Sequence, residues 1–196
     1  SGKPGSGKTT LLDTVSKKNK ISNGSLFYEN SDIYSSSNKS FNNELAYVSQ
    51  VCKPRWFSVE YYMLQVISKT NHRKDDAKKH MNKICKQFNC SYLIDRKIRN
   101  LTPGQLRLIM LAAAIAADSK VLVIDELEQH LTKETLRLVM KILQRKSNYD
   151  GVSIIASTLN PELISSIASV HITLSDGRIT SVRSNMKRSR NRRSKR

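Results

Sequence analysis

Gly2-Lys3-Pro4-Gly5-Ser6-Gly7-Lys8-Thr9 opens the sequence and fits the pattern G-x-x-x-x-G-K-[ST] at every fixed position. A glycine-rich turn of this kind points successive backbone N–H groups at the phosphates of a nucleotide. We expect Lys8 to reach the β- and γ-phosphates and the Thr9 hydroxyl to bind Mg²⁺. Residues 10–15 follow as a predicted helix whose N-terminus faces the anion. This stretch therefore predicts a nucleotide-binding α/β domain.

A phosphate-binding loop of this kind follows a core strand, and a loop that starts at residue 2 leaves no room for one. We therefore expect the sequence to be truncated at its N-terminus and to lack its first strands. With 196 residues and 38% hydrophobic content, it can still form one large domain. Its longest apolar stretch, residues 106–117, is interrupted by Arg107 and is shorter than the roughly 20 residues of a membrane span.

The formal net charge is +18, and much of it is local. Residues 183–196 carry eight Lys or Arg side chains and no acid, so they are predicted to form a basic disordered tail. Two interpretations of the tail remain open: binding of a polyanion such as nucleic acid, and a solvated terminus. The three cysteines show no metal-ligand spacing and are expected to be reduced and structural.

An apolar run followed by two acids gives a second functional signal. Val121–Ile124 is rich in β-branched residues, as in a buried parallel strand, and Asp125 and Glu126 follow it directly. An acid at the carboxyl end of such a strand, beside a phosphate-binding loop, can hold Mg²⁺. The second acid is placed to act as a general base on an attacking water.

Strands and helices alternate along the rest of the sequence, which favours an α/β sheet. The other elements that we predict are strands at 25–28 and 45–49, a Ser/Asn-rich loop at 35–43, a mostly helical basic region at 58–88, a loop at 101–105 that opens a helix, a helix at 132–144, a buried strand at 152–156 and a hairpin at 171–182.

In order and spacing, these motifs resemble the ATP-binding cassette (ABC) ATPases over residues 1–182. The phosphate loop is followed by Gln50 after a strand, a helical insertion, Leu101-Thr102-Pro103-Gly104-Gln105, and then Asp125-Glu126. The five-residue stretch is similar to the family signature Leu-Ser-Gly-Gly-Gln. The resemblance implies a P-loop NTPase fold of ABC type, with a mostly parallel core sheet, a small antiparallel β part and a helical subdomain at about 58–118. Residues 7–13 and 154–161 look similar to the G subfamily of half-transporters.

The resemblance also implies roles in a head-to-tail dimer of two cassettes with ATP between them. Glu126 would be the general base, with Gln50 as a second catalytic residue, and Mg²⁺ would be served by Thr9, Gln50 and Asp125. Pro103 replaces a signature glycine and removes one backbone N–H. The phosphate-binding residues would be Gly2, Gly5, Ser6, Gly7, Lys8, Thr9 and Thr10, and those that contact the partner's γ-phosphate would be Thr102, Gly104 and Gln105.

Two positions depart from the family pattern. Thr132 stands where the family has the aspartate that crosses to the partner, and Leu159, or at best Thr158, stands where it has its switch histidine. Leucine cannot hydrogen-bond a γ-phosphate. His130 and His171 lie nearby in sequence and are interpreted as surface or structural histidines. We therefore expect ATP binding to be retained and hydrolysis to be impaired.

Three functions are compatible with this sequence. The first is the ATP-binding subunit or domain of an ABC transporter, membrane-associated on the cytoplasmic face, with a second cassette and a membrane-spanning domain as partners. Trp56, Phe57, Tyr61 and Tyr62 would contact that domain unless they pack among the helices. The alternative, which the basic charge favours, is a non-transport ABC protein that acts on nucleic acid or the ribosome. The third is a cassette that senses ATP without turnover.

Overall fold

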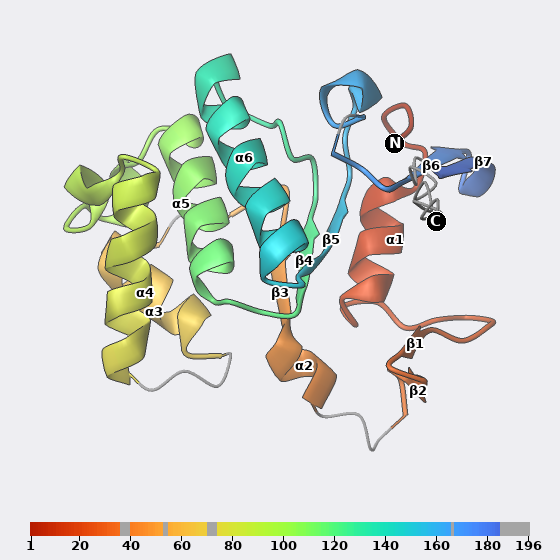
Figure 1. The fold of residues 1–196 in the computed structure, drawn as a ribbon, viewed down its shortest axis with the longest axis horizontal. Coiled ribbons are helices and arrows are strands. Elements are labelled where there is room, and N and C mark those ends of the chain that lie inside the picture. The colour runs from red at the N-terminus through yellow and green to blue at the C-terminus, as the bar shows by residue number, and fades with distance from the viewer. Residues whose placement is uncertain (36–39, 53–54, 70–73, 166, 185–196) are drawn as a thin grey trace, which may run out of the picture. The chain divides into compact units, whose positions relative to one another are not determined.

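The computed structural model describes residues 1–35, 40–52, 55–69, 74–165 and 167–184. The chain divides into two compact units. One is formed by Ser1–Lys8 together with Leu159–Arg196, and the other by Thr9–Thr158. Figure 1 gives the order of the elements along the chain.

A three-stranded parallel sheet is the centre of the Thr9–Thr158 unit. Its strands β3 (Leu45–Val48), β4 (Val121–Ile124) and β5 (Ser153–Ala156) lie in the order β3-β4-β5. All four residues of the middle strand β4 are buried, as predicted. The prediction that β5 is a buried strand was wrong, because β5 is an edge of this sheet and Ile155 remains 41% exposed.

A hydrophobic cluster joins this sheet to α1 (Lys8–Val15) and to the elements that follow α1. Its buried members come from segments far apart in the sequence: Leu12, Ile33, Phe41, Val121 and Val123. The short strands β1 (Phe27–Tyr28) and β2 (Ser31–Asp32) form an antiparallel ribbon beside it, so the strand predicted at 25–28 is shorter than expected.

Part of the loop predicted at residues 35–43 is helical. Helix α2 (Ser40–Glu44) occupies its last residues, whereas residues 36–39 lie outside the described residues. The Phe41 side chain explains the difference, because it is 3% exposed and packs on the Tyr28 ring at 5.0 Å between centroids. Burial of this one aromatic side chain outweighs the polar composition around it.

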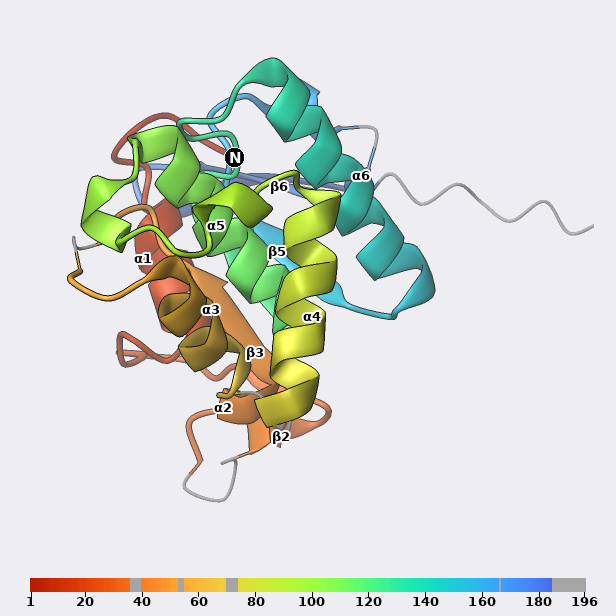
Figure 2. The same ribbon diagram turned by 90° about the vertical axis from the view of Figure 1, so that its left-hand side faces the viewer.

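Three helices pack on one another beside the sheet (Figure 2): α3 (Val59–Ile67), α4 (Lys74–Gln87) and α5 (Pro103–Ala116). The 3₁₀ turns η1 (Ser91–Leu93) and η2 (Ile98–Asn100) connect α4 to α5. Helix α6 (Lys133–Tyr149) extends beyond the end predicted for it at residue 144. In the described part of the chain, no helix combines the length and the hydropathy that crossing a bilayer requires.

The other unit contains the predicted hairpin. Strands β6 (Val170–Ser175) and β7 (Arg178–Ser184) pair antiparallel after the 3₁₀ turn η3 (Pro161–Leu163). The two turn residues have positive φ, 48° at Asp176 and 73° at Gly177, as a type I′ turn requires. Because β7 reaches Ser184, the first two residues of the predicted tail belong to a strand, and the rest of the tail lies outside the described residues.

The N-terminal loop is anchored to this hairpin. Leu174 N–H donates to the Ser1 carbonyl at 2.8 Å, and Gly177 N–H donates to the Ser6 carbonyl at 3.2 Å. A Cβ on Gly2 would lie 2.4 Å from the Leu174 carbonyl oxygen, and Gly2 has a φ of 154°. Only glycine therefore fits at position 2, where the N-terminal loop runs close to the backbone of β6.

Candidate functional site

The phosphate-binding loop holds its lysine in place. Lys8 Nζ donates to the carbonyls of Gly2 at 2.9 Å and Lys3 at 2.8 Å, and lies 3.4 Å from Ser6 Oγ. The side chain is buried, although it carries a charge. A buried ammonium needs such oxygen partners, and phosphate oxygens are the stronger acceptors that can replace them.

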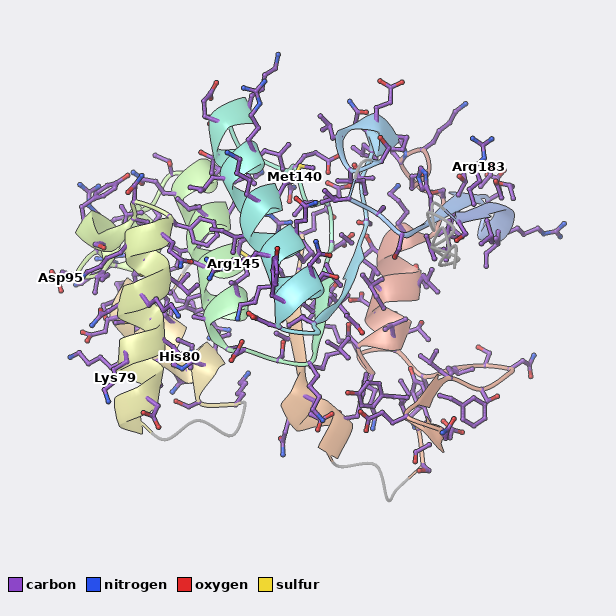
Figure 3. All side chains as sticks on the ribbon, in the orientation of Figure 1. Lys79, His80, Asp95, Met140, Arg145 and Arg183 are labelled. Carbon is purple, nitrogen blue, oxygen red and sulfur yellow. The ribbon has the colours of Figure 1, made fainter. Side chains whose placement is uncertain are left out.

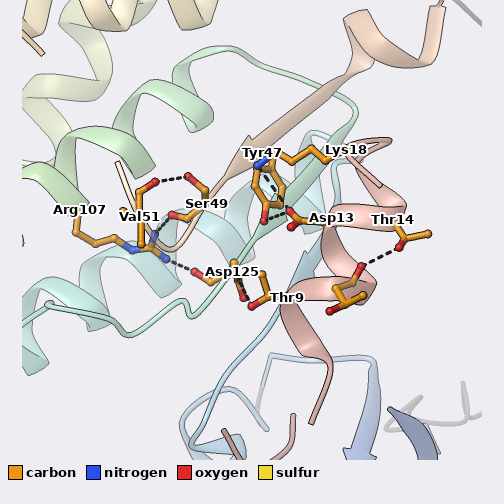
Figure 4. Close-up of polar contacts among 10 residues, drawn as sticks. Thr9, Asp13, Thr14, Lys18, Tyr47, Ser49, Val51, Arg107 and Asp125 are labelled. Carbon is orange, nitrogen blue, oxygen red and sulfur yellow. Dashed lines mark hydrogen bonds and ion pairs between the residues drawn. The ribbon is translucent and has the colours of Figure 1, made fainter. Parts of the chain in front are cut away.

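A second group of predicted residues gathers at the carboxyl ends of β3 and β4. Thr9 Oγ1, at the start of α1, donates to Asp125 Oδ2 at 2.8 Å (Figure 4). Gln50 Nε2, just beyond β3, donates to Glu126 Oε2 at 3.0 Å. Asp125 is completely buried. The fold thus brings together Thr9, Gln50, Asp125 and Glu126, which are far apart in the sequence.

Ser157 fixes both acids and was not predicted as a functional residue. Its Oγ donates to Asp125 Oδ1 at 2.6 Å and accepts the Glu126 backbone N–H at 2.7 Å. Ser157 follows β5, whose Ala156 lies opposite Ile124 at the end of β4. A hydroxyl directly after a strand that neighbours the acidic strand is the signal that could have identified it.

Arg107 ties helix α5 to the same edge of the sheet. Its guanidinium donates to the carbonyls of Ser49 at 2.8 Å, Asp125 at 2.6 Å and Glu126 at 2.7 Å. The residue is 2% exposed, and its Nε has no acceptor among the described residues. Burial lowers the pKa of Arg107, and the carboxylates of Asp125 and Glu126 act against this.

The sequence showed Arg107 only as an interruption of an apolar stretch. A cation inside an apolar helix needs buried acceptors, and this requirement is the signal that could have revealed its role. Glu126 has a φ of 49°, in the left-handed region that costs a non-glycine residue about 1–2 kcal/mol. The Glu126 N–H donates to Ser157 Oγ, and the Glu126 carbonyl accepts from Arg107. These two hydrogen bonds hold that backbone in place.

The signature-like residues 101–105 open helix α5, as predicted, but the helix already begins at Pro103, so the loop is shorter than expected. Thr102 is the N-cap, and its Oγ1 accepts the Gln105 N–H at 3.3 Å while Gln105 Oε1 accepts the Thr102 N–H at 3.1 Å. This is a capping box, which satisfies two donors at the helix end. A Cβ on Gly104 would lie 2.9 Å from the His130 carbonyl oxygen, so this contact requires glycine.

The remaining predicted residues are placed as follows. Thr102, Gly104 and Gln105 make no hydrogen bond with the two acids in the described part of the chain. Thr10 is exposed on α1. Thr132 is the N-cap of α6 and accepts the Thr135 N–H at 3.2 Å.

Leu159, or at best Thr158, is predicted to occupy the position of the family's switch histidine. Leu159 is 46% exposed, and the preceding Thr158 donates its hydroxyl to Glu128 Oε1 at 2.8 Å. His130 is exposed, and His171 lies 3.0 Å from Ser1 Oγ. Neither histidine contacts an acid of the site among the described residues, in line with a surface or structural role.

The donors that could serve a metal are all oxygens: a hydroxyl at Thr9, an amide at Gln50 and a carboxylate at Asp125. Within the described ranges, no group of three or more His, Cys, Asp or Glu side chains gathers as a metal cage. This donor set suits Mg²⁺, which takes oxygen ligands, is commonly held through one or two carboxylates, and fills other positions with water and phosphate.

A family profile described as ABC transporter matches residues 1–129. The chain belongs to the ABC transporter family. It is therefore an ATP-binding ATPase domain of the ABC type, and the sequence-based predictions of ATP binding, ATP hydrolysis and a place in an ABC transporter are confirmed at this level. The roles of individual residues remain predictions.

Curated relatives support this assignment. The ATP-binding protein LolD of a lipoprotein-releasing system from Francisella tularensis (strain OSU18) is 24% identical over 185 residues, 91% of this chain and 79% of LolD. The cytochrome c biogenesis ATP-binding export protein CcmA of Rickettsia typhi is 25% identical over 165 residues, 80% of this chain and 75% of CcmA. The ATP-binding protein Uup of Buchnera aphidicola is 26% identical, and the alignment covers 92% of this ABC domain but 28% of Uup.

Solved structures show the fold. The dimeric ATP-binding cassette MJ0796 in a post-hydrolysis state bound to ADP and Pi superposes with a TM-score of 0.80 and 20% identity, over 93% of this chain and 82% of that one. An ATP-binding subunit of an ABC transporter gives a TM-score of 0.83 at 13% identity, over 94% of this chain and 77% of that one. The predicted P-loop α/β cassette fold is confirmed.

Proposed function

We propose that this ABC domain binds Mg²⁺–ATP, hydrolyses it slowly and thereby drives a transporter from the cytoplasmic face of a membrane. The observation that carries the proposal is the pair of hydrogen bonds from Thr9 to Asp125 and from Gln50 to Glu126, at 2.8 Å and 3.0 Å. They assemble a hydroxyl, an amide and two carboxylates at one edge of the sheet. We propose with it that the cassette spans residues 1–184, two more than predicted because β7 ends at Ser184, and that the basic tail follows.

The nucleotide's charge would be met by this chain's own donors. Lys8 would exchange the carbonyls of Gly2 and Lys3 for phosphate oxygens, and the loop backbone at Gly5, Ser6 and Gly7 would add N–H donors. Thr9, Asp125 and Gln50 would hold Mg²⁺, which when bound neutralises charge on the phosphate oxygens.

Glu126 would act as the general base. A general base needs a carboxylate in a fixed orientation. The Gln50 amide donates to the Glu126 carboxylate at 3.0 Å, while Ser157 bonds the Glu126 N–H and Arg107 bonds its carbonyl. The carboxylate can then accept a proton from an attacking water without first reorganising.

A second cassette would complete the site from the outside. At the start of α5, Pro103 has no N–H and the Gln105 N–H is bonded to Thr102, so Gly104 carries the N–H without an acceptor in the described part of the chain. A helix N-terminus with a free donor suits an anion. We therefore propose that Gly104, with the Thr102 and Gln105 side chains, contacts ATP held by a partner cassette.

Contact with a membrane-spanning partner is proposed for the exposed aromatic residues near Gln50. Trp56 is 76% exposed and Tyr61 50% exposed, whereas Phe57 and Tyr62 are half-buried. Arg99 lies over the Trp56 ring at 4.2 Å, and Phe57 packs on Tyr61 at 5.0 Å. Exposed aromatics of this kind are typical of interfaces. The likeness of residues 7–13 and 154–161 to G-subfamily half-transporters makes that subfamily our proposal for the transporter type.

A role on nucleic acid remains the second candidate because the net charge is +18. A strongly basic surface attracts polyanions without sequence preference. The basic tail, which would contribute most to such binding, lies outside the described residues apart from Arg183 and Ser184.

Replacing Lys8 by alanine is expected to weaken ATP binding at least tenfold, because a charge-assisted hydrogen bond contributes about 1.5–3 kcal/mol. Titration calorimetry of the purified protein with Mg²⁺–ATP measures this. Lys3→Ala is the matched control, since the Lys3 side chain is exposed and only its carbonyl bonds Lys8. Equal affinities for the wild type and Lys8→Ala would exclude the proposed site.

Replacing Leu159 by histidine is expected to raise steady-state ATPase activity by about 10²-fold, because a missing transition-state donor typically costs about 10²–10³ in rate. Leu163→His is the control, since Leu163 is similarly exposed, at 40%, and lies four positions further on. Rapid wild-type turnover with no gain from Leu159→His would show that another group performs the histidine's function.

A further inference from the structure

A groove of about 630 Å³ lies between α4 and α6 within the Thr9–Thr158 unit. In the view of Figure 1, α5 is drawn between these two helices. The floor of the groove is aliphatic, since Ile84, Ile115 and Ala116 are at most 6% exposed. Leu138 and Ile142 of α6 are half-buried and line the same space.

The rim of the groove is cationic. Lys83 of α4 and Lys141 and Arg145 of α6 are exposed lining residues. None of the three forms an ion pair with another side chain in the described part of the chain. Figure 3 labels His80, another lining residue, on α4 and Arg145 on α6. The groove therefore carries an excess of positive charge, since its only acids among the lining residues are Asp118 and Asp150.

The two acids of the groove, Asp118 and Asp150, both form their ion pairs with Lys146. Lys146 Nζ lies 2.9 Å from Asp150 and forms an ion pair with Asp118 as well. The hydrogen bond from Lys146 holds the pKa of Asp150 below its ordinary value, and Arg145 and Lys83 add to this effect. Both acids are thus paired with Lys146 at one end of the groove.

We propose that this groove docks an amphipathic α-helix of another protein, with its apolar stripe on the α5 floor and acidic side chains facing Lys83, Lys141 and Arg145. Helix α6 has 17 residues, which corresponds to about 25 Å, so the wall is long enough for several turns of a docked helix. An apolar groove between helices is a common receptor for such a segment. The complementary charge fixes which helices are accepted.

An acidic helix accounts for both features of the groove, whereas a nucleic acid accounts for one. A phosphate backbone would pair with the cations but leave Leu138 and Ile142 in water. Burying apolar surface is favourable, and only a ligand with its own apolar face obtains this gain. The proposed partner is independent of the ATP-binding residues, none of which lines the groove.

The test uses a fluorescein-labelled synthetic peptide of about 17 residues, with leucines at i, i+3, i+4 and i+7 and glutamates on both flanks, titrated with the full chain. We expect saturable binding that weakens at least tenfold in the double variant Lys141→Glu, Arg145→Glu. The matched control is Lys86→Glu, Arg137→Glu, which changes the net charge equally at exposed positions of α4 and α6 that do not line the groove. Circular dichroism checks that all variants are folded.

A scrambled peptide of the same composition, whose leucines do not share one face, is expected to bind at least tenfold more weakly. Equal affinities for the two peptides, no binding of the amphipathic peptide, or equal losses in the two double variants would each overturn the proposal. So would a single-stranded RNA oligonucleotide that binds more tightly than the peptide and is released by the Lys141→Glu, Arg145→Glu change, because the groove would then be a polyanion site.

Discussion

Replacing Glu126 by glutamine is expected to lower single-turnover ATP hydrolysis by about 10²–10⁴-fold while leaving ATP affinity nearly unchanged. The substitution removes a negative charge that can accept a proton, and a general base typically contributes this factor. The amide oxygen can still accept the 3.0 Å hydrogen bond from Gln50, so the position of the side chain is kept. A radiolabelled ATP assay with protein in excess measures the rate without the need for fast turnover.

Glu128→Gln is the matched control for this prediction. Glu128 lies two positions further along the same loop, and its carboxylate accepts the Thr158 hydroxyl at 2.8 Å. The same chemical change there should affect the rate much less. If the Glu126 and Glu128 variants lose activity equally, or if Glu126→Gln hydrolyses ATP within fivefold of wild type, the base is another group.

Replacing Arg107 by methionine is expected to destabilise the protein by about 3 kcal/mol or more, because three carbonyls lose their donor and each unsatisfied buried group costs about 1–3 kcal/mol. Methionine has a similar length but no donor, so the carbonyls of Ser49, Asp125 and Glu126 would stay buried without their charged partner. Urea unfolding followed by circular dichroism measures the change as a lower midpoint at an unchanged slope.

Two further variants make the Arg107 prediction specific. Arg137→Met removes an exposed arginine from α6 and is expected to change the free energy of unfolding by at most about 0.5 kcal/mol. Arg107→Lys keeps the charge but cannot reach three carbonyls with a planar fork, so its stability should fall between wild type and Arg107→Met. A midpoint for Arg107→Met equal to that of Arg137→Met would show that the three hydrogen bonds do not stabilise the fold.

Much of the fold and of the candidate site could be predicted because the signals were local. Strand β4 is predictable from four consecutive apolar residues, and the β6–β7 hairpin from Asp176 and Gly177, which accept positive φ at little cost. The start of α5 is likewise predictable from Thr102 and Gln105, which are three residues apart and form a capping box. The fixed spacing of the phosphate loop identified Lys8 and Thr9 in the same way.

The rest depended on contacts between distant segments. The polar composition of residues 35–43 predicts a loop, but α2 forms because Phe41 finds a buried site against Tyr28. The apolar residues of β5 predict burial, whereas the order of the strands places β5 at an edge. Propensity is a weak signal when tertiary packing opposes it.

The sequence alone determined that this protein is an ABC cassette, because the motifs of that family occur at fixed spacings along the chain. Only the tertiary structure decided that Arg107 and Ser157 hold the acids in place and that α4 and α6 enclose a cationic groove. The physical reason is that a buried cation or hydroxyl is defined by its partners, and the partners of Arg107 lie up to 58 residues away in the chain. No local pattern specifies such partners, since folding alone brings them within hydrogen-bonding distance.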